Sequence, residues 1–456
     1  EEALPYRFRG LAGRFTYGFD DRYFAEFNFG YNGSENFTPK NRYGFFPSVG
    51  LGWVISNESF FEPLTNVIQY LKVRGTWGQV GNSQISGRRF AYLATVTDSS
   101  STSYTFGKNM DQNYGTTAID EYAVDVTWEV ADKTDIGVDM RLLNNKLNLQ
   151  FDYFKESREG IYLRRSSIPS YVGMINNPYG NIGKVENKGF ELSVNYANSW
   201  GGDWSLSLMG NYSFNRNKVL EDDSTVVYPW QNTIGNKVGQ RFGLVALGLF
   251  ESYGEIAASP VQTGDTRPGD IKYKDINGDG KIDEYDKVPI GWGSVPEIMY
   301  GFGFSVGWKN LSLTAMFQGA AHVDAMLSGE GVLPFSQGSS RGNLLSNITD
   351  RWTEENPRQN AFYPRLSIGN INMNYEESTW WLKDTDYLRL KNIELSYRLP
   401  DHWMKRIHLD NARIFIQGVN LLTFSSFKIW DVELGDGRGA RYPNIASVSL
   451  GVNFNF

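Results

Sequence analysis

Stretches in which apolar and polar residues alternate strictly recur along the whole of this chain. The last ten residues, SVSLGVNFNF, place Val448, Leu450, Val452, Phe454 and Phe456 on one face and serine, glycine and asparagine on the other. Successive side chains of a β-strand point to opposite faces, so this period of two indicates strands with one apolar face. The sequence therefore predicts an all-β chain, although a soluble sandwich would show the same alternation.

The pattern predicts about thirteen strands, each bounded by turn residues. KLNLQFDYF, WSLSLMGNYSF and RYFAEFNFGY are clear examples. The predicted strands lie near residues 10–19, 22–32, 44–56, 70–80, 128–142, 146–160, 187–199, 204–217, 297–308, 311–321, 386–398, 412–422 and 444–456.

The connections between these strands alternate between short and long. Tight turns are predicted at 20–21, 143–145, 201–203 and 309–310, and moderate connections at 57–69 and 399–411. The alternate connections are loops, the longest at 81–127, 161–186, 218–296, 322–385 and 423–443. In an up-and-down meander every second connection lies at the same end, so one end has turns and the other has loops. This asymmetry is typical of a transmembrane antiparallel β-barrel with short periplasmic turns and long extracellular loops.

Such a barrel in the bacterial outer membrane turns its apolar residues to lipid and its polar residues to the lumen. We interpret the alternating final strand, with Val452, Phe454 and Phe456 on its apolar face, as a membrane-assembly signal. Bacterial barrels of this kind have an even number of strands. A chain with about thirteen strands is therefore expected to be the C-terminal portion of a larger barrel. The net charge of -7 argues against a nucleic-acid partner.

Several long segments resemble one family of outer-membrane proteins. They are RYGFFPSVGLGWVISNESFF, LKVRGTWGQVGN, NIGKVENKGFELSVNY, YLRLKNIELSYRLP and ARIFIQGVNLLTFSSF. On these segments the chain is similar, over essentially all of residues 1–456, to the C-terminal barrel portion of SusC-like TonB-dependent transporters of Bacteroidetes.

The resemblance implies a function and a set of partners. It implies a barrel of about 22 strands with a plug in its lumen, of which roughly nine strands and the plug lie outside this chain. A SusD-like surface lipoprotein would cap the barrel, and TonB–ExbB–ExbD would act through the missing N-terminal part. Two transporter–lipoprotein units would pair in the membrane and import an oligosaccharide or a peptide nutrient. We expect no enzymatic activity.

The predicted loop 218–296 contains DINGDGKIDEYD at 275–286, a segment with the spacing of a calcium-binding loop. Oxygen-bearing side chains at positions 1, 3, 5, 9 and 12 and a backbone carbonyl at position 7 are the ligands of an EF-hand loop, and glycine at position 6 allows its sharp turn. A free loop that binds Ca²⁺ is therefore predicted, although position 12 is aspartate where glutamate is usual. The alternative is an acidic turn without an ion. The predicted ligands are Asp275, Asn277, Asp279, Lys281, Asp283 and Asp286.

Three other functional interpretations remain open: a passive channel, an outer-membrane enzyme, and a surface adhesin or structural barrel. A passive porin-like channel would lack the plug and the lipoprotein, and its loops would be shorter than 218–296 and 322–385. An outer-membrane enzyme would need a Ser/His/Asp set near the rim, and the chain has only three histidines. Trp380 and Trp381 are predicted to pack within a loop or in an aromatic girdle, with sugar stacking as the alternative.

Overall fold

The computed structural model describes residues 5–455, except for 86–87, 109, 111, 330, 336–343, 370, 407–408 and 436. Thirteen strands form one antiparallel sheet in which each strand pairs with the next strand of the sheet along the chain. They are β1 (Phe8–Phe19), β2 (Tyr23–Ser34), β3 (Tyr43–Val54), β4 (Ile68–Asn82), β7 (Glu129–Leu142), β8 (Leu147–Arg164), β9 (Tyr179–Trp200), β10 (Trp204–Glu221), β15 (Ile298–Trp308), β16 (Leu311–Ala321), β19 (Tyr387–Arg398), β20 (Asn411–Ser425) and β21 (Ser447–Asn455).

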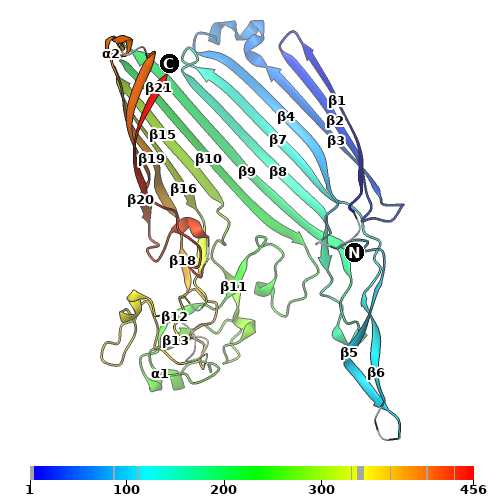
Figure 1. Cartoon of the computed structure of the whole chain (residues 1–456). Coiled ribbons are helices and arrows are strands. Elements are labelled where there is room, and N and C mark those ends of the chain that lie inside the picture. The colour runs from blue at the N-terminus through cyan, green and yellow to red at the C-terminus, as the bar shows by residue number, and fades with distance from the viewer. Residues whose placement is uncertain are drawn as a thin grey trace.

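The sheet is the curved arc of a barrel that is not closed (Figure 1). In the described part of the chain, β1 and β21 each have a strand neighbour on one side only. The predicted fold class and the predicted meander are confirmed, and each of the thirteen predicted strands corresponds to a strand of this sheet. No helix among the described residues is long and apolar enough to cross a membrane.

The tight turns form where the sequence permits a left-handed backbone. Asp20 and Asp21 between β1 and β2 have φ of 52° and 49°, and Gly201 and Gly202 between β9 and β10 have φ of 62° and 75°. Two successive residues with positive φ match the right-handed twist of the strands they join, and aspartate and glycine tolerate this conformation best. The predicted short turns therefore fix the strand register at this end of the sheet.

The outer face of the sheet carries the apolar set predicted to contact lipid. Aromatic side chains lie in contact across strands, for example Phe15 with Phe27 at 6.4 Å and Phe190 with Tyr212 at 5.7 Å between ring centroids. Near the tight turns, Trp204 lies 6.0 Å from Trp308. Tryptophan beside the strand ends is typical of the aromatic girdle at a membrane interface.

At the loop end, three strands extend at least four residues beyond their predicted bounds. β8 reaches Arg164 and β10 reaches Glu221, while β9 begins at Tyr179, so the predicted loop 161–186 is reduced to 165–178. Charged residues and Gly160, with a φ of 67°, interrupt the alternation where the ladder between β8 and β9 shifts register. The prediction ended the strands at this irregularity, whereas the backbone pairing continues beyond it.

The long loops contain secondary structure that was not predicted. The loop after β4 carries the hairpin of β5 (Thr95–Phe106) and β6 (Gln112–Glu121), which projects away from the sheet (Figure 1). Three smaller pairs form within the loops after β10 and β16. They are β11 (Arg241–Gly243) with β14 (Val288–Ile290), β12 (Ala246–Leu249) with β13 (Ile271–Tyr273), and β17 (Asp324–Met326) with β18 (Leu382–Asp384). Among the described residues, the α-helices are α1 (Tyr253–Ala257), in the loop after β10, and α2 (Asp401–Arg406), in the connection between β19 and β20.

Close packing between β9 and β10 gives a test of the register. A Cβ atom on Gly189 would lie 2.0 Å from the carbonyl oxygen of Phe214 and 2.8 Å from the Phe154 ring. Gly189→Ala should therefore cost about 1–3 kcal/mol and reduce the amount of heat-modifiable, folded protein in outer membranes. Gly210→Ala is the control, because its Cβ would meet its nearest neighbour at 3.9 Å. Equal amounts of folded protein from the two variants would contradict this register.

Candidate functional site: the lumen wall and the extracellular loops

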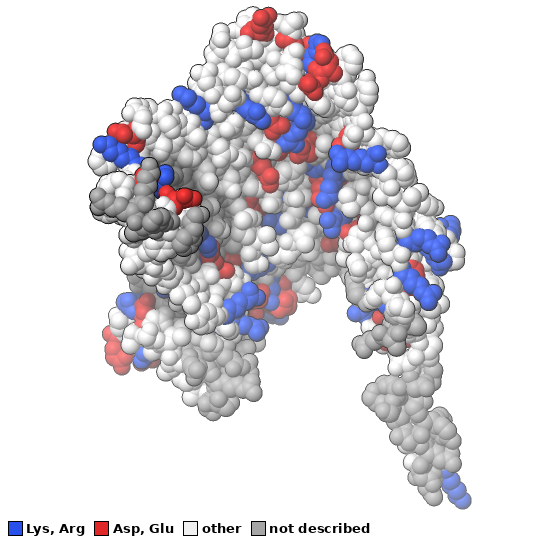
Figure 2. Space-filling model, turned by 45° about the horizontal axis from the view of Figure 1, so that its top comes forward, with Lys and Arg blue, Asp and Glu red and all other residues white. Residues whose placement is uncertain are grey.

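The inner face of the sheet is polar and carries charges of both signs. Figure 2 shows acidic and basic side chains mixed on this concave surface. On β4, Arg74 donates to Asp135 at 3.0 Å and to Asp139 at 3.3 Å, and it also bonds Asp152. Three carboxylates share this one guanidinium, so the cluster carries a net negative charge toward the lumen. Charge-assisted hydrogen bonds of this kind hold neighbouring strands in register while keeping the wall hydrophilic.

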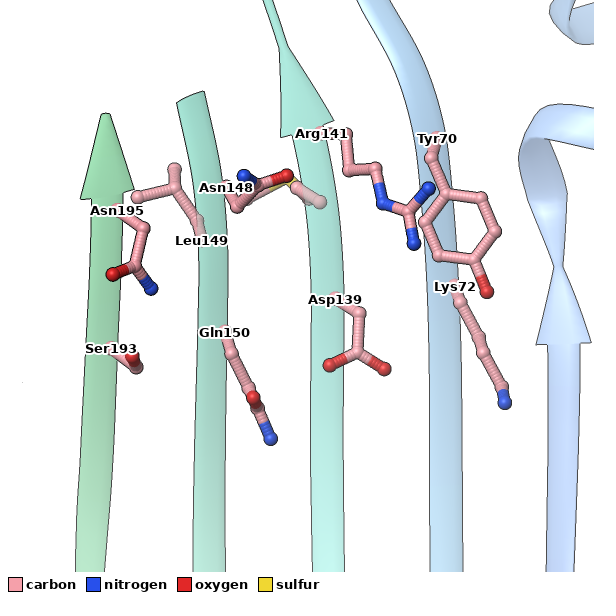
Figure 3. Close-up of a pocket in the computed structure, with 10 residues that line it drawn as sticks. Tyr70, Lys72, Asp139, Arg141, Asn148, Leu149, Gln150, Ser193 and Asn195 are labelled. Carbon is pink, nitrogen blue, oxygen red and sulfur yellow. The ribbon is translucent and has the colours of Figure 1, made fainter. Parts of the chain in front are cut away.

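Toward the tight turns, a groove of about 310 Å³ crosses the inner faces of β4, β7, β8 and β9 (Figure 3). The Arg141 guanidinium lies over the Tyr70 ring at 4.9 Å. Lys72, Asp139 and Gln150 present charged and amide groups on the same surface. Such a wall suits hydrated, polar solutes, and nothing in the groove offers an apolar enclosure.

The extracellular loops after β10, β16 and β20 pack together into what we term the loop body, residues 222–297, 322–386 and 426–446. Its core is built from buried apolar side chains of all three loops. Trp381, with 1% of its surface exposed, packs with Tyr363 at 6.1 Å between ring centroids. The members of this core are Leu244, Leu249, Ile271, Tyr273, Ile282, Ile290, Met326, Leu327, Val332, Leu333, Trp352, Ala361, Tyr363, Trp381, Phe427 and Val432.

This arrangement resolves the interpretation of the tryptophan pair. Trp381 lies in the core of the loop body and Trp380 packs against it, with the Trp380 indole donating to the Phe362 carbonyl at 3.2 Å. Loop packing is therefore confirmed for both residues.

A buried carboxylate organises the polar interior of the loop body. Asp270 is 1% exposed and accepts two hydrogen bonds of 2.9 Å from Arg365. Asn374 and Asn372 donate to it at 2.8 and 3.2 Å. The sequence analysis missed this residue, because its side-chain partners lie about a hundred positions further along the chain and no local motif joins them.

The predicted calcium-binding segment 275–286 forms a compact loop within this body. Asp275 accepts from the backbone N–H of Gly278 at 2.6 Å and of Gly280 at 2.9 Å. Asn277 and Asp279 accept from the N–H groups two residues further on. Gly280, with a φ of 81°, makes the turn that position 6 requires. The spacing therefore produces the tight loop that was predicted.

The carboxylate at position 12 faces inward. Asp286 is fully buried and accepts from the backbone N–H of Ile276 at 2.7 Å and of Asp283 at 2.9 Å, which joins the two ends of the loop. Among the described residues, no three His, Asp or Glu side chains converge closely enough to hold a metal ion. The oxygen donors of positions 1, 3 and 5 fit Ca²⁺, whereas Asp286 is committed to loop closure. The calcium site stays a prediction.

A protease assay on the full-length protein tests whether the loop 275–286 binds Ca²⁺. If Ca²⁺ binds, removal of the ion with a chelator should speed proteolytic cleavage within 275–286. The double variant Asp275→Ala/Asp279→Ala should have the same effect. In the wild type, the cleavage rate should fall to half its ion-free value at roughly 10⁻⁴–10⁻³ M Ca²⁺. Glu284→Ala is the control, because this exposed carboxylate stands outside the ligand pattern. Cleavage of the wild type that is indifferent to chelator would reject the site.

The predicted assembly residues lie on the outer face of the last strand. Val452 and Phe454 of β21 are exposed on the face that the prediction assigned to lipid, while Phe456 lies outside the described residues. Their role as an assembly signal stays a prediction.

Comparison with known proteins identifies the family that has this architecture. Residues 6–421 match the family model described as TonB dependent receptor-like, beta-barrel. The chain belongs to this family. The receptor chain is 28% identical to TonB-dependent receptor P3 of Formosa agariphila over 97% of its own length and 45% of that protein. It is 27% identical to TonB-dependent receptor SusC of Bacteroides thetaiotaomicron, over 97% of its own length and 43% of SusC.

The solved structures agree in fold. The structure of the RagAB peptide transporter superposes with a TM-score of 0.72 at 22% identity, covering 99% of this receptor chain and 48% of that one. The SusC resemblance, the TonB-dependent receptor barrel and the outer-membrane location predicted from the sequence are thus confirmed. The family is one of receptors and transporters, not of enzymes. The chain spans about half the length of the relatives that it matches.

Proposed function

We propose that this receptor chain forms the C-terminal part of the barrel wall of an importer for an oligosaccharide or peptide nutrient. The family match over residues 6–421 carries the proposal. The lumen wall supports it, because its mixed charges and amides suit a hydrated solute that passes through. The loop body supports it as a folded structure at the extracellular mouth. The chain itself would perform no bond chemistry.

The partners follow from the same relatives. The N-terminal part of the same transporter would supply the remaining strands, pair with the free edges of β1 and β21, and carry the plug. TonB–ExbB–ExbD would act on that part to open the conduit. A SusD-like surface lipoprotein would close over the extracellular loops, and two such units would pair in the membrane.

Uptake by intact cells tests the energised import. Cells that carry the full-length receptor should deplete either a mixture of oligosaccharides or a mixture of peptides from the medium, as followed by mass spectrometry. Deletion of the receptor and deletion of tonB should each abolish that depletion, because a plugged conduit opens only when TonB acts. Depletion that needs the receptor but survives deletion of tonB would favour the passive porin-like channel.

A further inference from the structure

A cavity of about 850 Å³, which we term the rim pocket, lies at the extracellular ends of β8, β9 and β10. The inner faces of these strands form its wall, and residues 233–242 of the loop body cover it. That cover is anchored, because the backbone N–H of Val238 donates to Asn217 at 2.7 Å and the backbone N–H of Val219 donates to the carbonyl of Asn236 at 2.8 Å. Lys237 forms an ion pair with buried Glu297 at 3.0 Å.

Side-chain amides repeat along the wall of the rim pocket. Asn217 faces Asn187 directly across the β9–β10 ladder, and Asn215 lies two residues away on the same face of β10. Residues on one face of a strand repeat about every 6.6 Å, which is also the repeat of an extended peptide bound alongside. An amide side chain both donates and accepts, as a peptide group does. The side-chain carbonyl oxygen of Asn187 is buried and has no hydrogen-bond partner among the described residues, so a rotation of this amide that exposed the oxygen to the pocket would give it a partner in a ligand N–H.

Charges of both signs line the same cavity. Arg158 pairs with Glu129 at 3.1 Å and with Glu156 at 2.9 Å, and its side chain is still 44% exposed. Lys184 lies opposite Glu221 in the ladder. A peptide carries an ammonium group, a carboxylate and charged side chains that these groups can pair with. A neutral oligosaccharide can hydrogen-bond to these groups through its hydroxyls, but it has no charge with which to form an ion pair.

The apolar part of the wall is aliphatic. Ile161, Leu163, Val185 and Val219 line it, and Phe242 is the single aromatic residue among the residues that define the pocket. The flat faces of sugar rings pack best on aromatic planes, whereas peptide side chains fill irregular aliphatic surfaces. We propose that the rim pocket binds a segment of extended peptide on its way into the lumen. This assignment rests on the proposed import function and names its substrate class.

The test compares uptake of a tryptic digest of casein with uptake of malto-oligosaccharides by cells whose full-length receptor is wild type or altered. Asn215→Leu should lower receptor-dependent peptide depletion about tenfold. The substitution removes one hydrogen bond to the peptide and leaves a peptide amide without a partner, and such a loss corresponds to about a tenfold change in affinity. The double variant Asn187→Leu/Asn215→Leu should lower it further. Asn211→Leu is the matched control on the same face of β10, four residues deeper in the barrel and outside the pocket. Heat-modifiable receptor in outer membranes is measured for each variant.

The outcomes separate this assignment from the import function. TonB-dependent peptide depletion that falls in the pocket variants, at wild-type receptor levels and with Asn211→Leu unaffected, supports the rim pocket. TonB-dependent depletion of malto-oligosaccharides alone overturns the peptide assignment and leaves import standing. Peptide depletion that is equal in wild type and pocket variants overturns the pocket as the site. Depletion that is independent of TonB overturns the import proposal itself.

Discussion

Arg389→Ala is expected to release the last extracellular loop from the barrel. Arg389 on β19 is buried and donates to Asp431 at 2.5 Å and to Glu433 at 2.6 Å, both in the loop after β20. Its removal leaves the largely buried Asp431 carboxylate without its cation, while Glu433 keeps Lys391 at 3.3 Å. Loss of one partner of a buried ion pair costs about 3–5 kcal/mol. Hydrogen exchange of residues 427–446 in the detergent-solubilised full receptor should accelerate accordingly.

The same strand provides a control. Arg398 on β19 pairs with Asp401 at 3.4 Å, and both side chains are more than half exposed. Arg398→Ala should change local stability by no more than about 1 kcal/mol, because exposed pairs contribute little. If the two variants exchange at the same rate in 427–446, the Arg389 cluster does not hold the loop.

Lowering the pH should reproduce, in the wild-type protein, part of the loop destabilisation caused by Arg389→Ala. Burial acts to raise the pKa of Asp431, but hydrogen bonds from Arg389 and from the Glu433 N–H outweigh it, so the pKa lies below the ordinary 3.8. A lowered pKa in the folded state means that the stabilisation is fully present above the ordinary value. It is lost as the pH falls through the lowered pKa. The difference in pepsin sensitivity between wild type and Arg389→Ala should therefore shrink as the pH falls below about 4.

Asp270→Ala is expected to open the loop body as a unit. The substitution removes the acceptor for Arg365, Asn372 and Asn374, and it leaves a guanidinium and two amides without their partner in the interior. Loss of one partner of a buried charged pair costs about 3–5 kcal/mol. Exchange should accelerate together in 244–290 and 345–382, since the two segments share one core.

Asp265 is the matched control for this experiment. It lies five residues before Asp270, is exposed, and pairs with exposed Arg267 at 2.7 Å. Asp265→Ala should leave the exchange of both segments near that of the wild type. Acceleration confined to the few residues around position 270 would mean that the loops are stabilised separately and do not form one body.

The strands were predictable because lipid imposes a local rule. A residue that faces hydrocarbon is apolar whatever its distant contacts are, so Phe15 and Leu208 could be assigned a face from their neighbours alone. The turns were predictable because pairs such as Asp20–Asp21 and Gly201–Gly202 permit a left-handed backbone. Where the membrane no longer constrains the strands, as beyond Gly160, the alternation lapsed and the predicted ends were wrong.

The loop body was not predictable, because its order comes from contacts between distant segments. Strands of three residues, such as β11 and β14, are too short to show a period. Local sequence does not reveal that Leu244 and Trp381 belong to one core, or that Asp270 pairs with Arg365. In the calcium-like loop the spacing predicted the turn correctly, but it could not reveal that Asp286 points inward.

One feature of the rim pocket was within reach of the sequence. Once the turn after Trp200 is recognised, Asn187 and Asn217 each lie thirteen residues from the paired Trp200 and Trp204, so they must face one another. Counting outward from a tight turn in this way would have predicted that the two amides are paired across the ladder. The loop that covers them could not be placed by that count.

The shared core of the loop body links the folding of loops that are far apart along the chain. Leu244 shares this core with Trp381 and Phe427, which come much later in the chain, as well as with residues of its own loop such as Ile271. The core is therefore complete, and its apolar side chains covered, only when all three loops have reached the cell surface. Contacts so far apart along the chain close slowly. The last step of maturation is then the folding of the receptor mouth, after most of the membrane wall is in place.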